Sequence, residues 1–273
     1  MPRERALYWN ERNGMYPYIH IGSFSLGTFG LMLWLAAVCA SVVLHRNFKR
    51  WHIEADAIGI VAISTVAGII GAKLWNSFED PRYLFQHPAA VLFSRQGFAW
   101  FGGLIAAILA LLWEGRAVKL RPLTMLDLAA PAAAVGYGVG RIGCLTSGDG
   151  DYGIPSKLPW AMSFPHGTVP TDIPRHPTPI YEFIVALIIG WILWRRGAAE
   201  RPTGQITGEY LVMTGVARFL VEFIRINPKI YWGMSNAQLA SIASVIAGTA
   251  LIWWSRRHAM RTSLTQIETS AVS

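Results

Sequence analysis

Apolar residues run through this chain in long blocks, which charged residues and clusters of Pro and Gly separate. Most blocks approach the 20 residues that a helix needs to cross a hydrocarbon core about 30 Å thick. We therefore expect an all-α integral membrane protein with about seven transmembrane helices. The predicted spans are 24–44, 57–75, 98–113, 123–145, 179–194, 206–224 and 236–254. The alternative, a soluble protein with seven buried core helices, fits poorly with so few charged residues.

The composition agrees with a membrane protein. Apolar residues make up 53% of the 273 residues and charged residues only 15%, whereas soluble domains carry about 25% charged residues. The chain has two cysteines, Cys39 and Cys144, and Cys39 lies inside an apolar block. A disulfide framework or a thiolate metal site is therefore not expected.

The distribution of Lys and Arg predicts the orientation in the membrane. Linkers 1–2, 3–4 and 5–6 with the C-terminal segment hold twelve Lys and Arg residues, against nine in the N-terminal segment and the other linkers. The positive-inside rule then places the N-terminus outside and the C-terminus in the cytoplasm. We expect one transmembrane domain over 1–262, a long outer loop over 146–178 between spans 4 and 5, and a short disordered cytoplasmic tail over 263–273.

The net charge of +8 has three possible explanations: binding to nucleic acid, binding to anionic lipid, or basic loops on the cytoplasmic side of a membrane. Nucleic-acid binding requires a basic stripe on one soluble face. Here the basic residues are divided among short loops, so the charge reflects membrane orientation and no nucleic-acid partner is expected.

Several charged residues lie within or at the ends of the predicted spans. In the predicted topology five of them reach the outer leaflet from four spans: Lys73, Arg141, Glu182, Arg218 and Glu222. Each costs about 2.5–3.5 kcal/mol to insert at the centre of a bilayer unless it is paired or reaches water, so such a cluster predicts a functional site. The alternatives are that Lys73 snorkels to the interface and that Arg218 and Glu222 only neutralise each other at i, i+4.

Two glycine-rich stretches adjoin these charges, Gly102-Gly103 in span 3 and four glycines around Arg141 in span 4. They either make room for a ligand or allow close packing of helices. The outer loop is long and rich in Gly, Pro and Asp, and it holds His166 and His176. Such a loop is typical of a lid or a binding loop.

The stretch from Gly140 to Gly153, GRIGCLTSGDGDYG, resembles the signature of the prolipoprotein diacylglyceryl transferase family. Further matches follow the order of that family along most of the chain. They are His20-Ile21-Gly22, Gly102-Gly103-Leu104-Ile105, Arg175-His176-Pro177 with Tyr181-Glu182, and the pattern that holds Gly215, Arg218, Phe219, Glu222, Phe223 and Arg225.

The resemblance implies an enzyme of the bacterial inner membrane, with phosphatidylglycerol, the lipobox of a preprolipoprotein and membrane lipid as its partners. It would move the diacylglyceryl group to the lipobox cysteine, forming a thioether and releasing glycerol phosphate. The catalytic candidates are Arg141, Arg218, Glu222, His176 and Asp149. Candidates for binding the phospholipid are Arg141, Arg218, Arg225, Gly102, Gly103, Gly153 and Glu182. Arginine suits the phosphate because its guanidinium binds two oxygens at once. No cofactor and no metal is expected.

The sequence departs from the family pattern at four positions. Phe101 stands where the family often has His, Cys144 replaces the usual Asn, Thr214 replaces a Tyr, and Phe29 stands where Tyr is usual in span 1. The base that would activate the acceptor thiol is therefore not identified. Three alternatives remain: the same donor with another acceptor, a catalytically silent lipid- or lipopeptide-binding protein, and a transporter, which the absence of an inverted repeat disfavours.

Overall fold

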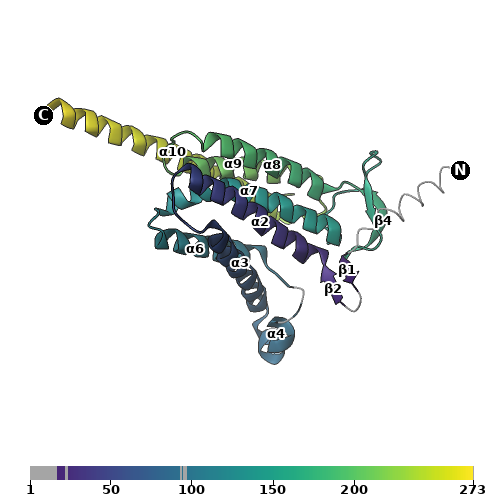
Figure 1. Cartoon of the computed structure of the whole chain (residues 1–273). Helices are drawn as coiled ribbons and strands as arrows, with labels where there is room; N and C mark the ends of the chain where they lie inside the picture. The colour runs from purple at the N-terminus through teal and green to yellow at the C-terminus, as the bar shows by residue number, and fades with distance from the viewer. Residues whose placement is uncertain (1–16, 22–23, 93, 95–96, 273) are drawn as a thin grey trace.

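The computed structural model describes residues 17–21, 24–92, 94 and 97–272, and its long helices form an elongated bundle (Figure 1). Seven long helices overlap the seven predicted spans: α2 (Thr28–Arg50), α3 (Ala57–Glu79), α6 (Trp100–Ala117), α7 (Pro122–Ser147), α8 (Thr178–Arg196), α9 (Gln205–Val221) and α10 (Asn236–Val272). Residues 1–16 of the predicted outer N-terminal segment, and Gly22 of the His20-Ile21-Gly22 match, lie outside the described residues.

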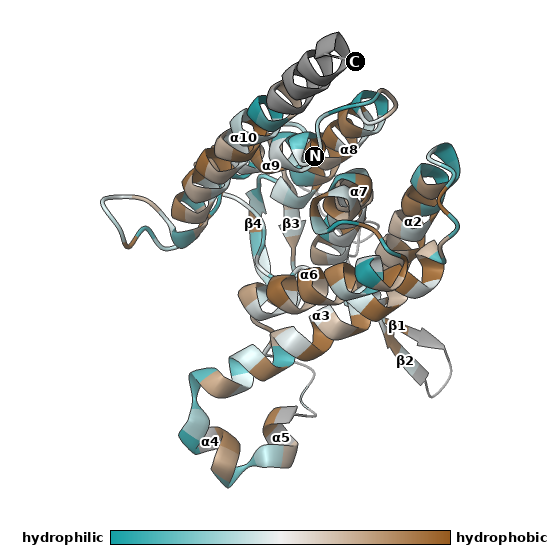
Figure 2. Cartoon of the chain, turned by 90° about the vertical axis from the view of Figure 1, so that its left-hand side faces the viewer, coloured by the Kyte–Doolittle hydropathy of each residue, from teal (hydrophilic) through white to brown (hydrophobic). Residues whose placement is uncertain are grey.

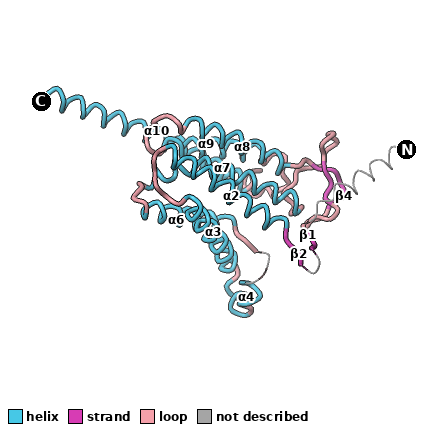
Figure 3. Tube along the Cα trace, viewed as in Figure 1, coloured by secondary structure: helices cyan, strands magenta, loops and turns pink. Residues whose placement is uncertain are grey.

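Shorter elements precede the first long helix or connect later ones (Figure 3). Strands β1 (Tyr18–Ile21) and β2 (Phe24–Gly27) form one antiparallel hairpin, and β3 (Met162–Phe164) and β4 (Thr171–Arg175) form another. Two short helices, α4 (Pro81–Gln86) and α5 (Pro88–Leu92), connect α3 to α6. The 146–178 segment predicted as an outer loop thus contains a small hairpin, which gives it a fixed shape.

Six helices in the described part of the chain are long and apolar enough to cross a membrane: α2, α3, α6, α7, α8 and residues Asn236–Met260 of α10. The fold is therefore that of a multi-pass membrane protein. The remaining predicted span, 206–224, corresponds to α9, which has 17 residues. At 1.5 Å per residue it is about 25 Å long, shorter than a hydrocarbon core of about 30 Å. The count of seven spans is therefore not confirmed.

The first helix begins later than the sequence predicted. Residues 24–27 form β2, and Gly27 is the extended residue before α2. The backbone N–H and the side-chain hydroxyl of Thr28 both donate to the carbonyl oxygen of Pro17, at 3.0 and 3.1 Å. These bonds tie the start of α2 to the hairpin, so the apolar residues of 24–27 belong to a strand.

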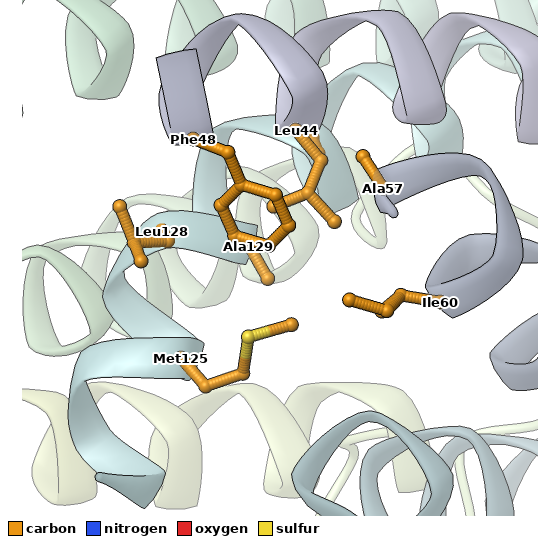
Figure 4. Close-up of a cluster of buried hydrophobic side chains, with 8 residues drawn as sticks. Leu44, Phe48, Ala57, Ile60, Met125, Leu128 and Ala129 are labelled. Carbon is orange, nitrogen blue, oxygen red and sulfur yellow. The ribbon is translucent and has the colours of Figure 1, made fainter. Parts of the chain in front are cut away.

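Helix α7 is the centre of the bundle, because it contacts α2, α6, α8 and α9. Leu44 and Phe48 of α2 pack with Ile60 of α3 and with Met125 and Leu128 of α7 in one buried cluster (Figure 4). A second cluster joins α7 to α8 and α9 through Ala130, Ala134, Ile189, Leu193 and Ile206. Helix α3 packs mainly against α6, so this pair lies beside the bundle that surrounds α7.

Contacts at the helix ends show that α2 and α8 run in the direction opposite to α7 and α9. The amide of Asn47, near the end of α2, donates to the carbonyl oxygen of Leu128, near the start of α7. The backbone N–H groups of Gly204 and Thr207, at the start of α9, donate to Asp127 of α7. A hydrogen bond also joins the ends of α2 and α8. The ends of α2 and α8 and the starts of α7 and α9 therefore share one end of the bundle, and Arg141, Glu182 and Arg218 approach the other.

Hydrophobic residues predominate along the long helices, and hydrophilic residues are more frequent toward the helix ends and connections (Figure 2). Helix α10 continues past the bundle and through the residues that we expected to form a disordered tail. After Gly248 the chain holds no Gly or Pro, the two residues that most often end a helix, so the local sequence gives α10 no stop signal before Val272.

Candidate active site

Six ionisable side chains meet at one end of the bundle, opposite the end where α2 and α8 finish. They come from α7, α8, the end of α9 and the loops that follow α7 and α9. They are three guanidinium groups and three carboxylates, and we call them the ionic cluster: Arg141, Arg218, Arg225, Asp151, Glu182 and Glu222. The charges balance within this set. Five charged residues were predicted to converge, and four of them belong to the ionic cluster: Arg141, Glu182, Arg218 and Glu222.

Glu182, in the first turns of α8, is the common partner of all three arginines. Its Oε1 accepts from Arg218 Nη1 at 2.7 Å and from the hydroxyl of Tyr137 at 2.8 Å. Its Oε2 accepts from Arg225 Nη1 at 3.1 Å and lies 3.4 Å from Arg141 Nε. The carboxylate is almost fully buried, with 5% of its side chain exposed, so it holds the arginines in fixed positions rather than facing a ligand.

Glu222 and Arg225 are the other buried members of the cluster. Glu222 Oε2 lies 2.8 Å from Arg218 Nη2, and its Oε1 accepts from Ser235 Oγ at 2.8 Å and Asn227 Nδ2 at 2.5 Å. Its i, i+4 pairing with Arg218 agrees with the predicted role of orienting that arginine. Arg225 binds Glu182 and Asp151 and is 5% exposed, so it does not snorkel to the membrane boundary.

Arg141 is one of two arginines that keep some exposure. Its Nε donates to the Tyr137 hydroxyl at 3.0 Å, and its Nη1 contacts Asp151 and Cys144 Sγ. These contacts use Nε and Nη1, which leaves Nη2 available to a ligand. The exposed side-chain fractions are 14% for Arg141 and 23% for Arg218, against 5% for Arg225. Arg141 and Arg218 are therefore the arginines that a phosphate can reach.

Gly153 joins the signature segment to the rest of the site. Its backbone N–H donates to the carbonyl oxygen of His176 at 2.8 Å, and Ile154 N–H donates to the carbonyl oxygen of Ile224. A Cβ on Gly153 would lie 2.6 Å from that same oxygen of Ile224, which no side chain tolerates. The glycine thus permits the close approach that brings Asp151 to Arg225.

His176, a catalytic candidate, lies beside the cluster and is held by Tyr181. The Tyr181 hydroxyl accepts from Trp160 Nε1 at 2.7 Å and lies 3.2 Å from His176 Nδ1. Since the hydroxyl accepts from Trp160, its own hydrogen can be donated to Nδ1 of His176. A neutral imidazole in this arrangement carries its proton on Nε2, which makes Nε2 a donor.

Asp149 lies next to Cys144 rather than on an arginine. One of its oxygens accepts from the backbone N–H of Asp151 at 3.2 Å, and the carboxylate also hydrogen-bonds the Cys144 side chain. Burial, followed by the neighbouring charge of Asp151, raises the pKa of Asp149. Ligand atoms of Cys144, Asp149 and Asp151 lie within 4.8 Å of one another. Arg225 and Arg141 engage the two oxygens of Asp151, so this carboxylate belongs to the ionic cluster.

Other candidates lie away from the ionic cluster. Gly102 and Gly103 face α3, where a Cβ on Gly102 would collide with Trp75 and the backbone of Gly71. Both glycines therefore allow α3 and α6 to pack closely. Lys73 donates to the carbonyl oxygen of Ser94 at 3.0 Å and to its hydroxyl at 2.7 Å, so it is bound within the α3–α6 connection.

The positions that depart from the family pattern have ordinary local contacts. Phe101, at the start of α6, is half exposed and packs edge-on against Trp100. The Thr214 hydroxyl donates to the carbonyl oxygen of Tyr210, one turn earlier in α9, at 2.7 Å. Phe29 lies in close contact with Gly143 of α7, within 3.2 Å of where a Cβ on that glycine would be. None of these three side chains has an ionisable group, so none can take a proton from a thiol.

Two members of the site were missed from the sequence. They are Asp151, which binds Arg141 and Arg225, and Tyr137, which links Arg141 to Glu182. Tyr137 lies one turn before Arg141 at i, i−4. That spacing places both side chains on the same face of α7 and is the signal that could have found it.

The ionic cluster predicts a specific dependence of stability on pH. Burial alone would raise the pKa of Asp151, but the guanidinium groups of Arg225 and Arg141 outweigh burial and lower it. A lowered pKa stabilises the folded protein above the ordinary aspartate value of about 3.9, and this contribution disappears as the pH falls through the lowered pKa. We expect the free energy of unfolding in detergent micelles to fall as the pH is lowered below about 4.

Asp149→Asn is the matched control for this prediction. In Asp151→Asn the free energy of unfolding should already be lower than that of wild type at neutral pH. Its further decrease on acidification should be smaller than in wild type. In Asp149→Asn the acid-induced loss should persist, because the pKa of Asp149 is shifted in the opposite direction. Equal acid dependence in wild type and Asp151→Asn would contradict the assignment.

Comparisons with known proteins identify the family. A family model described as prolipoprotein diacylglyceryl transferase matches residues 17–254. The phosphatidylglycerol–prolipoprotein diacylglyceryl transferase of Methylibium petroleiphilum is 36% identical over 246 residues, which cover 86% of this chain and 90% of that protein. The proteins of the same name from Pseudomonas putida and Nitrosomonas europaea are 32% and 33% identical, over 86% and 88% of this chain and 91% and 89% of theirs. The chain therefore belongs to the prolipoprotein diacylglyceryl transferase family.

Proposed function

We propose that the protein transfers the diacylglyceryl group of phosphatidylglycerol to the thiol of the lipobox cysteine of a preprolipoprotein. The relatives described above carry the name of this activity. The observation in this chain that supports it best is the ionic cluster, in which buried carboxylates hold two partly exposed arginines side by side at one end of the bundle. Such a pair suits the phosphate diester of a phospholipid at the level of its headgroup.

The reaction needs the site to stabilise a leaving phosphate. The thiol sulfur forms a bond to the glyceryl carbon that carries the phosphate, and the bond from that carbon to the phosphate oxygen breaks. The electron pair of the broken bond stays on the oxygen, so negative charge develops on glycerol phosphate as it leaves. Arg141 and Arg218 donate hydrogen bonds where that charge forms, and a site with little water makes each of these bonds more effective.

The proton of the attacking thiol must go to a base, because the thiolate is the nucleophile. We propose Asp149 for this role, since it is not paired with an arginine in the described structure and its raised pKa makes it a stronger base than an ordinary aspartate. His176 would instead donate from Nε2 to a phosphate oxygen, because Tyr181 occupies Nδ1. Glu182, Glu222 and Arg225 hold the exposed arginines in place.

The topology belongs to the same proposal. With the N-terminus outside and the C-terminus in the cytoplasm, as the Lys and Arg distribution predicts, the ionic cluster lies at the outer leaflet. The alternating directions of the helices support seven crossings, in which α9 crosses in addition to the six long apolar helices and packs against α7, α8 and α10. Residues 1–262 then form one transmembrane domain, and 263–272 are a cytoplasmic extension of α10.

The function is tested with the purified full chain in liposomes that contain phosphatidylglycerol labelled in its headgroup glycerol, together with a lipobox peptide. The expected result is release of labelled glycerol phosphate and a peptide heavier by one diacylglyceryl group. Release of glycerol phosphate with another acceptor, but not with the peptide, would favour an enzyme that uses the same donor and a different acceptor. Binding of the phospholipid without any release would favour a catalytically silent protein.

The pH profile of transfer tests Asp149 as the base. In Asp149→Asn we expect kcat to fall by about 10²-fold, within the range for general acid–base catalysis, and the loss of activity on the acid side of the profile to disappear. Because the pKa of Asp149 is raised, the wild-type profile should fall at a higher pH than an ordinary aspartate would give. Cys144→Ser, which changes the neighbour that hydrogen-bonds Asp149, is the control and should largely retain activity. Full activity in Asp149→Asn, or inactivity of a folded Cys144→Ser, would overturn this assignment.

A further inference from the structure

An apolar groove lies between α2 and α8, away from the ionic cluster. Both helices pack on α7, and the groove has a volume of about 220 Å³. Val135 of α7 and Gly190 of α8 meet where the two helices pack, since a Cβ on Gly190 would lie 2.9 Å from the Val135 side chain. It is lined by Val43, Arg46, Val135, Leu187, Gly190, Trp191 and Trp194. All except Arg46 are apolar or aromatic, as expected for a surface that contacts an acyl chain.

The groove ends at a group of arginines. Arg46 lines it directly, and in the part of the chain that the structure describes no carboxylate pairs with Arg46. The guanidinium of Arg50 lies 3.8 Å from the centre of the Trp194 ring, and its Nη1 donates to the carbonyl oxygen of Trp194 at 2.9 Å. The guanidinium of Arg195 lies 5.8 Å from the centre of the Trp191 ring. The mouth is therefore positively charged, and its tryptophans are of the type that anchors helices at the membrane interface.

The length of the groove fits one leaflet. Leu187 and Trp194 are seven residues apart on α8, which is about 10 Å along the helix axis, against about 15 Å for half of the hydrocarbon core. Glu182 of the ionic cluster is twelve residues from Trp194 on the same helix, or about 18 Å. The groove and the ionic cluster thus face opposite leaflets, and a lipid in one site does not occupy the other.

We propose that this groove is a binding site for an anionic phospholipid of the leaflet opposite the ionic cluster. One acyl chain lies between α2 and α8 on Val135, and the phosphate lies against Arg46, with Arg50 and Arg195 adding positive charge at the mouth. Basic pockets between transmembrane helices bind anionic headgroups in this way, and each basic residue near the surface contributes about 1 kcal/mol, or about fivefold in affinity. A lipid bound there would hold α2 and α8 against α7.

Photo-crosslinking tests the site directly. The full chain is placed in nanodiscs of phosphatidylcholine that contain a small fraction of phosphatidic acid with a diazirine in its acyl chain. This probe is anionic but lacks the glycerol headgroup of the proposed donor. Labelled peptides are mapped by mass spectrometry. We expect labels on the segments that contain Val43 and Leu187–Trp194, and about fivefold less labelling there from a phosphatidylcholine probe with the same diazirine chain.

Variants separate the headgroup from the chain. Arg46→Gln should lower labelling by the anionic probe about fivefold, whereas Arg116→Gln removes an exposed charge of α6 and should leave labelling unchanged. Leu187→Trp fills the groove and should abolish labelling by both probes while transfer activity at the ionic cluster remains. Equal labelling by the two probes, no effect of Arg46→Gln, or labels spread evenly over α3 and α6 would each overturn the proposal.

Discussion

Replacing Glu182 by Gln is expected to destabilise the folded protein by about 3–5 kcal/mol and to reduce transfer by at least 10²-fold. The substitution keeps the size of the side chain but removes the negative charge that contacts three arginines. Removing one partner from a buried ion pair leaves an uncompensated buried charge, which is the source of this large cost. The new amide group would also point a donor at guanidinium groups that are themselves donors.

Glu209→Gln is the matched control for this experiment. Glu209 is also a helical glutamate paired with an arginine, since Arg196 Nε and Nη2 donate to its oxygens at 2.5 and 2.7 Å. It lies at the opposite end of the bundle, however, and the side chain of Arg196 is 40% exposed. Water can therefore solvate Arg196 when its partner is neutralised, and the expected cost is only about 1 kcal/mol.

Unfolding in mixed micelles and transfer rates should be measured on the same preparations. A third variant, Glu182→Asp, keeps the charge but shortens the side chain, so it should recover more stability than Glu182→Gln while activity stays low. If Glu182→Gln costs no more than Glu209→Gln, Glu182 does not organise the arginines. The assignment of the ionic cluster as one cooperative unit would then be wrong.

The convergence of Arg141, Glu182 and Arg218 could be predicted from the sequence because of two simple regularities. Apolar blocks give the approximate helices, and successive helices reverse direction, so the end of one and the start of the next lie in the same leaflet. Arg141 near the end of α7, Glu182 near the start of α8 and Arg218 near the end of α9 follow directly. The same argument failed for Lys73, since α3 pairs with α6 at the side of the bundle.

The choice between Asp149 and Asp151 could not be made from the sequence. The two residues are separated only by Gly150, whose φ of 93° is a conformation that glycine adopts readily. Which carboxylate faces Arg141 depends on how this turn docks on the loop after α9, through Gly153 and Ile224. That docking is a tertiary contact between segments about 70 residues apart, and local sequence patterns do not encode it.

Replacing either partly exposed arginine of the ionic cluster is expected to stop transfer. Arg141→Ala and Arg218→Ala each remove a group that, in the proposed reaction, donates to the leaving phosphate, and activity should fall below detection. Arg141→Lys and Arg218→Lys keep the charge but lose the planar fork that binds two oxygens. We expect these conservative variants to lower kcat by 10²–10³-fold, the typical effect of removing one preorganised donor.

Arg196→Lys is the control, because Arg196 makes a two-bond pair with Glu209 at the other end of the bundle. The measurement is kcat for glycerol phosphate release, with thermal unfolding of each variant recorded in parallel. Arg141 and Arg218 are partly exposed, so their lysine variants should unfold within a few degrees of wild type although they are nearly inactive. Arg225→Lys should lose both stability and activity, since Arg225 is buried between Asp151 and Glu182.

Lysine variants of Arg141 and Arg218 that keep wild-type kcat would show that a positive charge is sufficient. Recognition of the phosphate would then not depend on the geometry of the two guanidinium groups.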